Sequence, residues 1–148
     1  MIDPTPHQSG FAAFADRFAG IAKLSHRDLP ALRAAVGELG FAWFSVDLSR
    51  ARNVPGFIKA LQRDLRFPDW FGGNLDALND CLSDFSWCPA PGYVITLDHV
   101  EMLATSPTAF AAFNEVLASA VDEWQRRETP FWIFYLTDAV DSDGMNGA

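Results

Sequence analysis

Residues 67–85 read FPDWFGGNLDALNDCLSDF, which combines an aromatic pair, a double-glycine turn and a stretch of helical periodicity. Apolar side chains recur at helical spacing on one side of that stretch: Leu75, Leu78, Leu82 and Phe85. Carboxylates recur four residues apart on the opposite side: Asp76, Asp80 and Asp84. Like charges at this spacing destabilise a helix by about 0.2–0.5 kcal/mol per pair. The pattern therefore favours a functional reason for the acidic face.

The same segment resembles the signature of the barstar family, the intracellular protein inhibitors of barnase-type ribonucleases. The resemblance lies in three blocks at fixed spacing: Trp70-Phe71-Gly72, Asn74-Leu75-Asp76-Ala77-Leu78 and Asp80-Cys81-Leu82. A fainter resemblance runs from about Phe41 to Leu136. The first 40 residues and the last dozen have no recognisable counterpart in the family pattern.

The resemblance implies a partner-binding surface formed by the predicted helix and the loop before it. In the family, acidic residues of this helix enter the ribonuclease active site and take the place of the RNA phosphates. Asp80 matches the central carboxylate of that surface, and Asp76 matches a second carboxylate one turn earlier. Charge-assisted hydrogen bonds to the basic residues of a ribonuclease site suit this task. The predicted surface comprises Trp70, Gly72, Gly73, Asn74, Leu75, Asp76, Asn79, Asp80 and Asp84.

Three positions depart from the family pattern. Asn79 stands where the best-known member has a tryptophan, and Gly73 stands where it has a glutamate. A further interface glutamate of the family aligns near Ser119, and the nearest carboxylates are one turn away, at Asp122 and Glu123. These changes keep the central carboxylates and alter the rim of the surface. They imply a different ribonuclease partner, or much weaker affinity for barnase itself.

Charge is distributed unevenly along the 148 residues, whose formal net charge is −8. Residues 1–66 contain nine Lys or Arg and six Asp or Glu, whereas residues 67–148 contain two and thirteen. No Lys or Arg occurs between Arg66 and Arg126. A surface built from this region would attract a basic partner and repel nucleic acid. The simpler alternative is a solvated acidic surface that only aids solubility.

Several protein classes fit the sequence poorly. No run of about 18 apolar residues is present, so no membrane span is expected. The N-terminus lacks the pattern of a signal peptide. The two cysteines, Cys81 and Cys88, do not form a disulfide framework, and Cys81 is expected to be a buried free thiol. A cytoplasmic protein is the simplest interpretation.

The pattern of elements predicts an α/β fold with a small three-stranded parallel sheet packed with helices. The strands are expected at 41–48, 93–97 and 131–136, because each is a short run that is apolar on both faces. Helices are expected at 11–24, 28–40, 53–67, 74–84 and 106–124, with Phe18, Leu39 and Phe110 facing inward. The predicted organisation is an N-terminal helical extension (1–40), a barstar-like domain (41–137) and a disordered tail (138–148).

An enzymatic role is not expected, and neither is a cofactor. His7, His26 and His99 are scattered, and no nucleotide-binding or hydrolase motif occurs. His99-Val-Glu101 could form an acid–base site, but a surface histidine is the more ordinary interpretation. Asp76 and Asp80 could bind Mg²⁺ in a nuclease, yet this half of the chain has few basic residues to hold nucleic acid.

The leading hypothesis is therefore an inhibitor that binds the active site of a basic extracellular-type ribonuclease or ribonuclease toxin. The alternative is a non-inhibitory interaction module of the same fold. That module would bind a basic protein, or pair with itself through Phe11, Phe14 and Phe18 of the extension. The chain is expected to be a monomer or a weak dimer.

Overall fold

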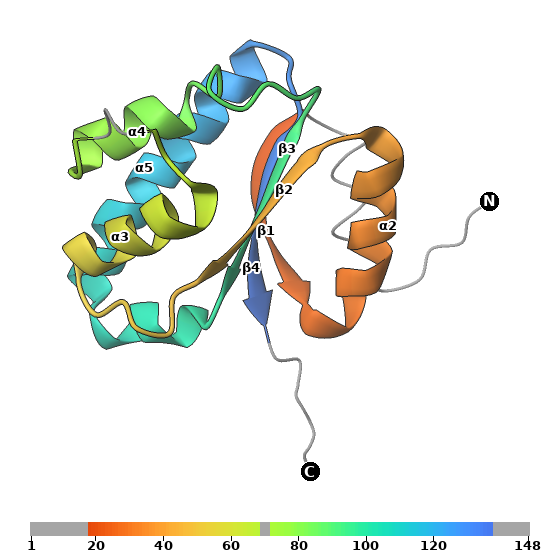
Figure 1. Cartoon of the computed structure of the whole chain (residues 1–148). Helices are drawn as coiled ribbons and strands as arrows, with labels where there is room; N and C mark the ends of the chain where they lie inside the picture. The colour runs from red at the N-terminus through yellow and green to blue at the C-terminus, as the bar shows by residue number, and fades with distance from the viewer. Residues whose placement is uncertain (1–17, 69–71, 138–148) are drawn as a thin grey trace.

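The computed structural model describes residues 18–68 and 72–137, which form a parallel sheet with helices on both faces (Figure 1). The strands lie side by side in the order β1-β4-β3-β2. They are β1 (Ala19–Ser25), β2 (Ala42–Asp47), β3 (Tyr93–Asp98) and β4 (Phe131–Thr137). The helices are α2 (Leu29–Leu39), α3 (Val54–Leu65), α4 (Leu75–Leu82) and α5 (Pro107–Arg126). Two 3₁₀ turns follow β1 and β3: η1 (His26–Asp28) and η2 (Val100–Thr105).

The parallel α/β fold is confirmed, but the sheet has four strands and the prediction of three is wrong. The additional strand is β1, which pairs with β4 from Ala19 opposite Phe131 to Ser25 opposite Thr137. Residues 19–24 are therefore not helical as predicted, and residues 11–17 of that predicted helix lie outside the described residues. Without β1, β4 would expose a row of unpaired main-chain groups, and pairing satisfies them.

Gly20 explains how closely β1 approaches β4. A Cβ atom at this position would lie 2.6 Å and 2.7 Å from two ring carbons of Trp132, the residue opposite it in β4. Real Cβ atoms do not approach other heavy atoms so closely, so a larger residue would push β1 or the indole out of place. Glycine is required here by the space that Trp132 occupies.

The two faces of the sheet are covered unequally. Helices α3, α4 and α5 pack on one face, and α2 packs alone on the other (Figure 1). The core under the three helices is the larger and includes a group of touching aromatic rings centred on Phe85. The core under α2 consists of Leu24, Leu32, Val36, Val94, Trp132, Phe134 and Leu136. Residues from the extension and from the predicted barstar-like domain therefore share this second core.

Local signals explain where the helices begin and end. The side chain of Asn53 accepts a hydrogen bond from the amide of Gly56 at 2.9 Å and caps α3, as the sequence predicts. Gly40 ends α2 with a left-handed φ of 73°, which is also the predicted stop. Three predicted inward residues are wrong, because Phe18 is 41% exposed, Leu39 is 50% exposed and Phe110 is 36% exposed. Leu39 is the last residue of α2, next to the Gly40 cap. The Phe110 ring packs edge-on against the Tyr135 ring of β4, with the ring centroids 6.1 Å apart, but remains partly exposed.

The predicted domain organisation concerns the tail of the chain and the boundary at residue 40. The predicted disordered tail, residues 138–148, lies outside the described residues. The division of the chain at residue 40 remains a prediction, although β1 and α2 share the sheet and a core with the rest. Within the described residues, every helix is too short or too polar to cross a membrane.

Replacing Leu32 by alanine is expected to destabilise the fold by about 2–5 kcal/mol, because Leu32 is fully buried between α2 and the sheet. Leu39→Ala on the same helix serves as the matched control, since Leu39 is half exposed and should change stability little. Urea unfolding followed by tryptophan fluorescence measures both variants. Equal stability of the two variants would show that α2 does not cover a real core.

Candidate functional site: the acidic helix α4

Helix α4 begins at a capped turn. Asn74 is the N-cap, in an extended conformation, and its side-chain oxygen accepts a hydrogen bond from the amide of Ala77 at 2.8 Å. Gly73 precedes it with a left-handed φ of 77°, a conformation that glycine adopts without strain. Gly72, Gly73 and Asn74 are all exposed, so the turn presents main chain to the solvent.

The inner face of α4 is fixed to the core. Leu78, Cys81 and Leu82 are fully buried, and Leu75 is half-buried beside them. At the end of the helix, the indole Nε1 of Trp124 donates a hydrogen bond to the main-chain oxygen of Leu82 at 2.6 Å. A buried bond of this kind satisfies one of the carbonyls that a helix end leaves without a partner. Helix α4 is therefore held at both ends.

The outer face of α4 carries exposed carboxylates. Asp76 and Asp80 are exposed, and neither forms an ion pair within the part of the chain that the structure describes. Asp76 lies in the first turn, where the helix dipole favours a negative charge. Asp80 lies near the end of the helix, where the dipole disfavours one. The position of Asp80 is thus not explained by helix stability.

Asp84 is placed differently from Asp76 and Asp80, with which it is predicted to share one face of the helix. Helix α4 ends at Leu82, two residues earlier than predicted, so Asp84 follows the helix. Its carboxylate accepts hydrogen bonds from the amide of Ser86 at 3.0 Å and from the Ser86 hydroxyl at 3.3 Å. Such a local turn competes with continued helix and explains the early end. The carboxylate remains exposed beside α4.

The remaining predicted residues differ in exposure. Trp70 lies outside the described residues, since the structure describes none of 69–71. Asn79 is half-buried, and its side-chain oxygen is buried with no hydrogen-bond partner among residues 18–68 and 72–137. A buried acceptor without a partner typically costs about 1–3 kcal/mol, so Asn79 is a second residue of α4 that stability does not explain.

The pKa of the Cys81 thiol is raised by its surroundings on this helix. Burial raises the pKa of its thiol to about 11, and the negative charges of Asp80 and Asp84 act in the same direction. Both cysteines are free, with Cys81 buried and Cys88 half-buried. The prediction of a buried free thiol at position 81 is confirmed.

At neutral pH, iodoacetamide is expected to alkylate Cys88 and to leave Cys81 unmodified. The reaction requires an accessible thiolate, and Cys81 is both buried and held in the thiol form. Mass spectrometry of peptides after a timed reaction measures the difference, and both residues should react in denaturant. Rapid alkylation of Cys81 in the native protein would show that α4 separates readily from the core.

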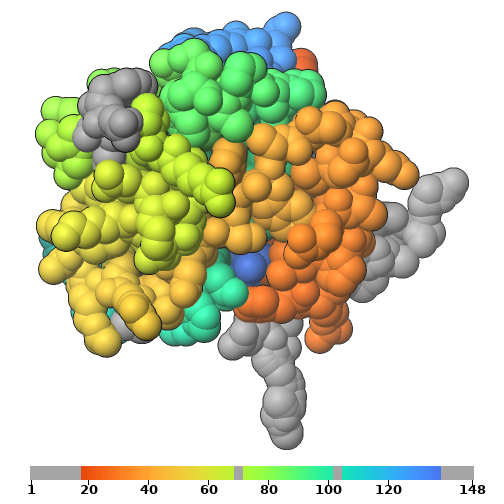
Figure 2. Space-filling view, viewed as in Figure 1, coloured from red at the N-terminus to blue at the C-terminus, as the bar shows by residue number. Residues whose placement is uncertain are grey.

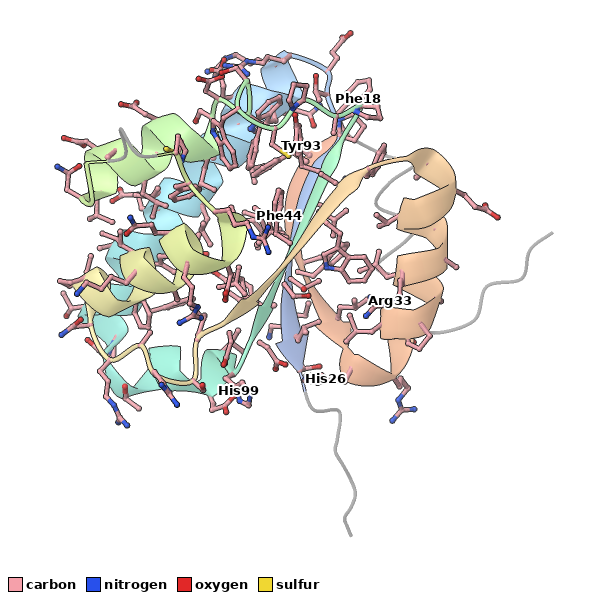
Figure 3. The ribbon with its side chains drawn as sticks, in the orientation of Figure 1. Phe18, His26, Arg33, Phe44, Tyr93 and His99 are labelled. Atoms are coloured by element: carbon pink, nitrogen blue, oxygen red, sulfur yellow. The ribbon has the colours of Figure 1, made fainter. Side chains whose placement is uncertain are left out.

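A second group of polar residues lies at the opposite end of the sheet, where the strands finish (Figure 3). His26 contacts the main-chain oxygen of Thr137 at 2.8 Å and Asp98 at 2.9 Å, so it joins the ends of β1, β4 and β3. His99 lies 3.4 Å from Glu101 and 3.9 Å from Asp47. The sequence shows these residues as scattered, and only their positions at strand ends could have indicated that they meet.

This second group has the features of a structural junction. The described residues contain no set of three His, Cys, Asp or Glu side chains that could hold a metal ion. Asp98 and Glu101 are engaged by histidines. The hollow beside them is lined by the ends of β3 and β4 and by the turns that follow β1 and β3. Unlike α4, the group has a neighbouring side chain for each of its charges.

Comparison with known proteins adds one positive result. A family model described as Barstar (barnase inhibitor) matches residues 41–136. The match includes α4 and the strands β2 and β3 with most of β4, and it leaves β1 and α2 outside. No curated protein matches the chain. The three strands predicted from the sequence are thus the strands of the matched region, and the fourth strand comes from outside it.

Proposed function

The chain belongs to the barstar family, and from that premise we propose that it inhibits a basic ribonuclease by covering its active site with α4. The observation that carries the proposal is the pair of exposed carboxylates, Asp76 and Asp80, which form no ion pair in the described part of the chain. A partner that supplies Lys, Arg and His would satisfy them with charge-assisted hydrogen bonds.

The rigidity of α4 supports this role. A binding surface that is already ordered loses little conformational entropy when a partner docks. The Asn74 cap, the buried leucines and the bond from Trp124 to Leu82 hold the helix before any partner arrives. Asp76 and Asp80 are one helical turn apart on that fixed support, which suits recognition of a site that binds successive phosphates.

The proposed roles of the residues follow from their positions. Asp80 is the central carboxylate that enters the ribonuclease site, and Asp76 pairs with a second basic residue one turn away. Asn74, Leu75 and the two glycines form the approach to the helix, with Trp70 as the aromatic contact that the family pattern implies. Asp84 lies at the rim. Asn79, beside Asp80, is half-buried and offers the partner less contact area than a tryptophan would.

The departures from the family pattern shape the choice of partner. Asn79 and Gly73 remove contact area and one charge from the rim, while both central carboxylates remain. Rim residues mainly tune which partner binds, and central charges contribute most of the affinity. We therefore propose a small basic ribonuclease other than barnase as the target. The protein acts by stoichiometric binding, without a cofactor or catalysis of its own.

RNA cleavage by small basic ribonucleases, measured at rising concentrations of the protein, tests the proposal. Cleavage by the true target should fall to zero at one inhibitor per enzyme, and high salt should weaken the inhibition because it screens the charges. A pull-down from a lysate of the source organism supplies candidates for the panel. If no basic ribonuclease lost activity, including those recovered in the pull-down, the proposal would be wrong.

A further inference from the structure

Strand β2 leaves one side of the sheet open. At the two ends of its pairing with β3, the amide of Ala42 donates to the main-chain oxygen of Gly92 at 2.9 Å, and the amide of Leu48 donates to the main-chain oxygen of Asp98 at 3.0 Å. In a parallel pair the bonded residues alternate, so even-numbered residues of β2 face β3. The main-chain groups of Trp43, Ser45 and Asp47 therefore point away from the sheet.

The last of these three residues already has partners. The amide of Asp47 donates to the carboxylate of Asp64 at 2.9 Å, and the Arg63 guanidinium donates to the main-chain oxygen of Asp47 at 3.0 Å. Within the described residues, the main-chain groups of Trp43 and Ser45 have no hydrogen-bond partner at this edge. The open edge is thus two residues long and is centred on Phe44.

A hollow of about 480 Å³ runs beside this edge, and its walls include Trp43, Phe44, Ser45, Leu65, Arg66 and Trp87. Figure 2 shows the region between the yellow-green end of α3 and the orange α2. Edge strands are usually protected by lysine, proline or a bulge. The segment from Trp43 to Ser45 contains no lysine or proline, and its register with β3 is continuous.

We infer that this edge pairs with the same edge of a second copy, antiparallel, about a two-fold axis through Phe44. In that register Trp43 of each copy lies opposite Ser45 of the other. Each of these two Trp43–Ser45 pairs exchanges two main-chain hydrogen bonds, so four bonds join the two sheets. The two Phe44 side chains meet at the axis, in the type of pair where cross-strand side chains are closest.

No neighbouring register satisfies the edge as well. If the two-fold axis passed through Trp43 or through Ser45, only that residue would lie opposite an open residue, namely the same residue of the second copy. The other open residue would face residue 41 or residue 47, and Asp47 is already bonded to Arg63 and Asp64. Only the axis through Phe44 pairs every open group and leaves those bonds intact.

The charges at this edge also favour a second copy. Among the described residues, three arginines and two aspartates surround it: Arg33 over the Trp43 ring, Arg63, Arg66, Asp47 and Asp64. This face is therefore close to neutral on a protein whose net charge is −8. Two copies can approach here without strong repulsion, whereas a strongly basic partner is drawn to α4.

Sedimentation velocity over a range of concentrations, with hydrogen exchange measured by NMR, tests the inference. The wild-type chain should form dimers that dissociate on dilution, and exchange of the Trp43 and Ser45 amides should slow in the dimer. Ser45→Pro removes an outward-facing amide that the monomer does not use, and a proline is tolerated at such an edge position. The variant should therefore fold and remain monomeric.

Two further variants complete the design. Ser45→Lys keeps the main-chain amide and places a charge at the edge, so it should also abolish the dimer. It provides the test if Ser45→Pro fails to fold. Leu39→Lys places the same charge at an exposed position on α2 and should still dimerise. Each folded variant should inhibit the ribonuclease as wild type does, because the edge and α4 are separate surfaces.

Three results would overturn the inference. The first is a wild-type chain that stays monomeric at every concentration. The second is a dimer that persists in folded Ser45→Lys. The third is protection of the Trp43 and Ser45 amides that arises only when another protein is added.

Discussion

Replacing Asp80 by alanine should weaken binding to the target ribonuclease by about 2–5 kcal/mol, which is a loss of affinity of roughly 30-fold or more. That range is a general one for truncation of one partner in a buried charge pair, and the barnase–barstar complex itself contributes to it. The expected loss is large because the basic residues that surround Asp80 in the complex would be left buried without a counter-charge. Isothermal titration calorimetry measures the change.

The control for this experiment is Glu38→Ala. Glu38 is an exposed carboxylate on α2, across the sheet from α4, and its removal changes the net charge by the same amount. It should alter the association rate slightly and the affinity little. Folding of both variants is checked by thermal unfolding. If Asp80→Ala and Asp76→Ala both bound as tightly as wild type, the acidic face of α4 could not be the inhibitory surface.

Replacing Phe85 by alanine should cost about 3–5 kcal/mol of folding free energy, the largest effect on stability that we expect. Phe85 is 2% exposed, and the centroid of its ring lies 4.3 Å from the ring centroid of Tyr93 and 4.8 Å from that of Trp87. Alanine would leave a cavity among rings that come from α5 and from β2, β3 and β4, which cannot all move inward to fill it.

Guanidinium unfolding, followed by far-ultraviolet circular dichroism, measures the effect. Phe110→Ala is the matched control, because the Phe110 ring is 36% exposed and should contribute much less. A loss below about 1 kcal/mol for Phe85→Ala would mean that the aromatic group repacks freely.

The parts of the fold that were predictable are those set by neighbours in the sequence. Asn53 and Asn74 cap the helices that follow them, and short apolar runs mark the strands of the matched region. Helix α4 and the exposure of Asp76 and Asp80 follow from periodicity alone. These signals need no knowledge of what lies across the sheet.

Strand β1 was not predictable in the same way. Phe18 and Ile21 continue a helical spacing that begins at Phe11, and the local signal against a helix, Gly20, is weaker than that spacing. The strand forms because β4 presents an unpaired edge and Trp132 leaves room for Gly20, and both facts depend on residues far along the chain. Tertiary pairing overrides local preference in such cases. The meeting of His26 with Asp98 depends on the same pairing.

The early end of α4 lies between these two cases. Asp84 continues the carboxylate spacing, so periodicity extends the helix to residue 84. The bonds from Ser86 to its carboxylate divert the chain instead. Aspartate followed two residues later by serine is a turn-forming pattern, and it could have moved the predicted boundary.

The pairing of β1 with β4 also has a consequence for the order of folding. Ala19 and Phe131 lie opposite each other in the sheet and are 112 residues apart in the sequence. During synthesis β1 leaves the ribosome long before the strand that completes it. Contacts between such distant segments form slowly, because a long loop must close first. Residues 41–136 contain the rest of the sheet, so β1 is expected to join late, as the step that completes a nearly folded molecule.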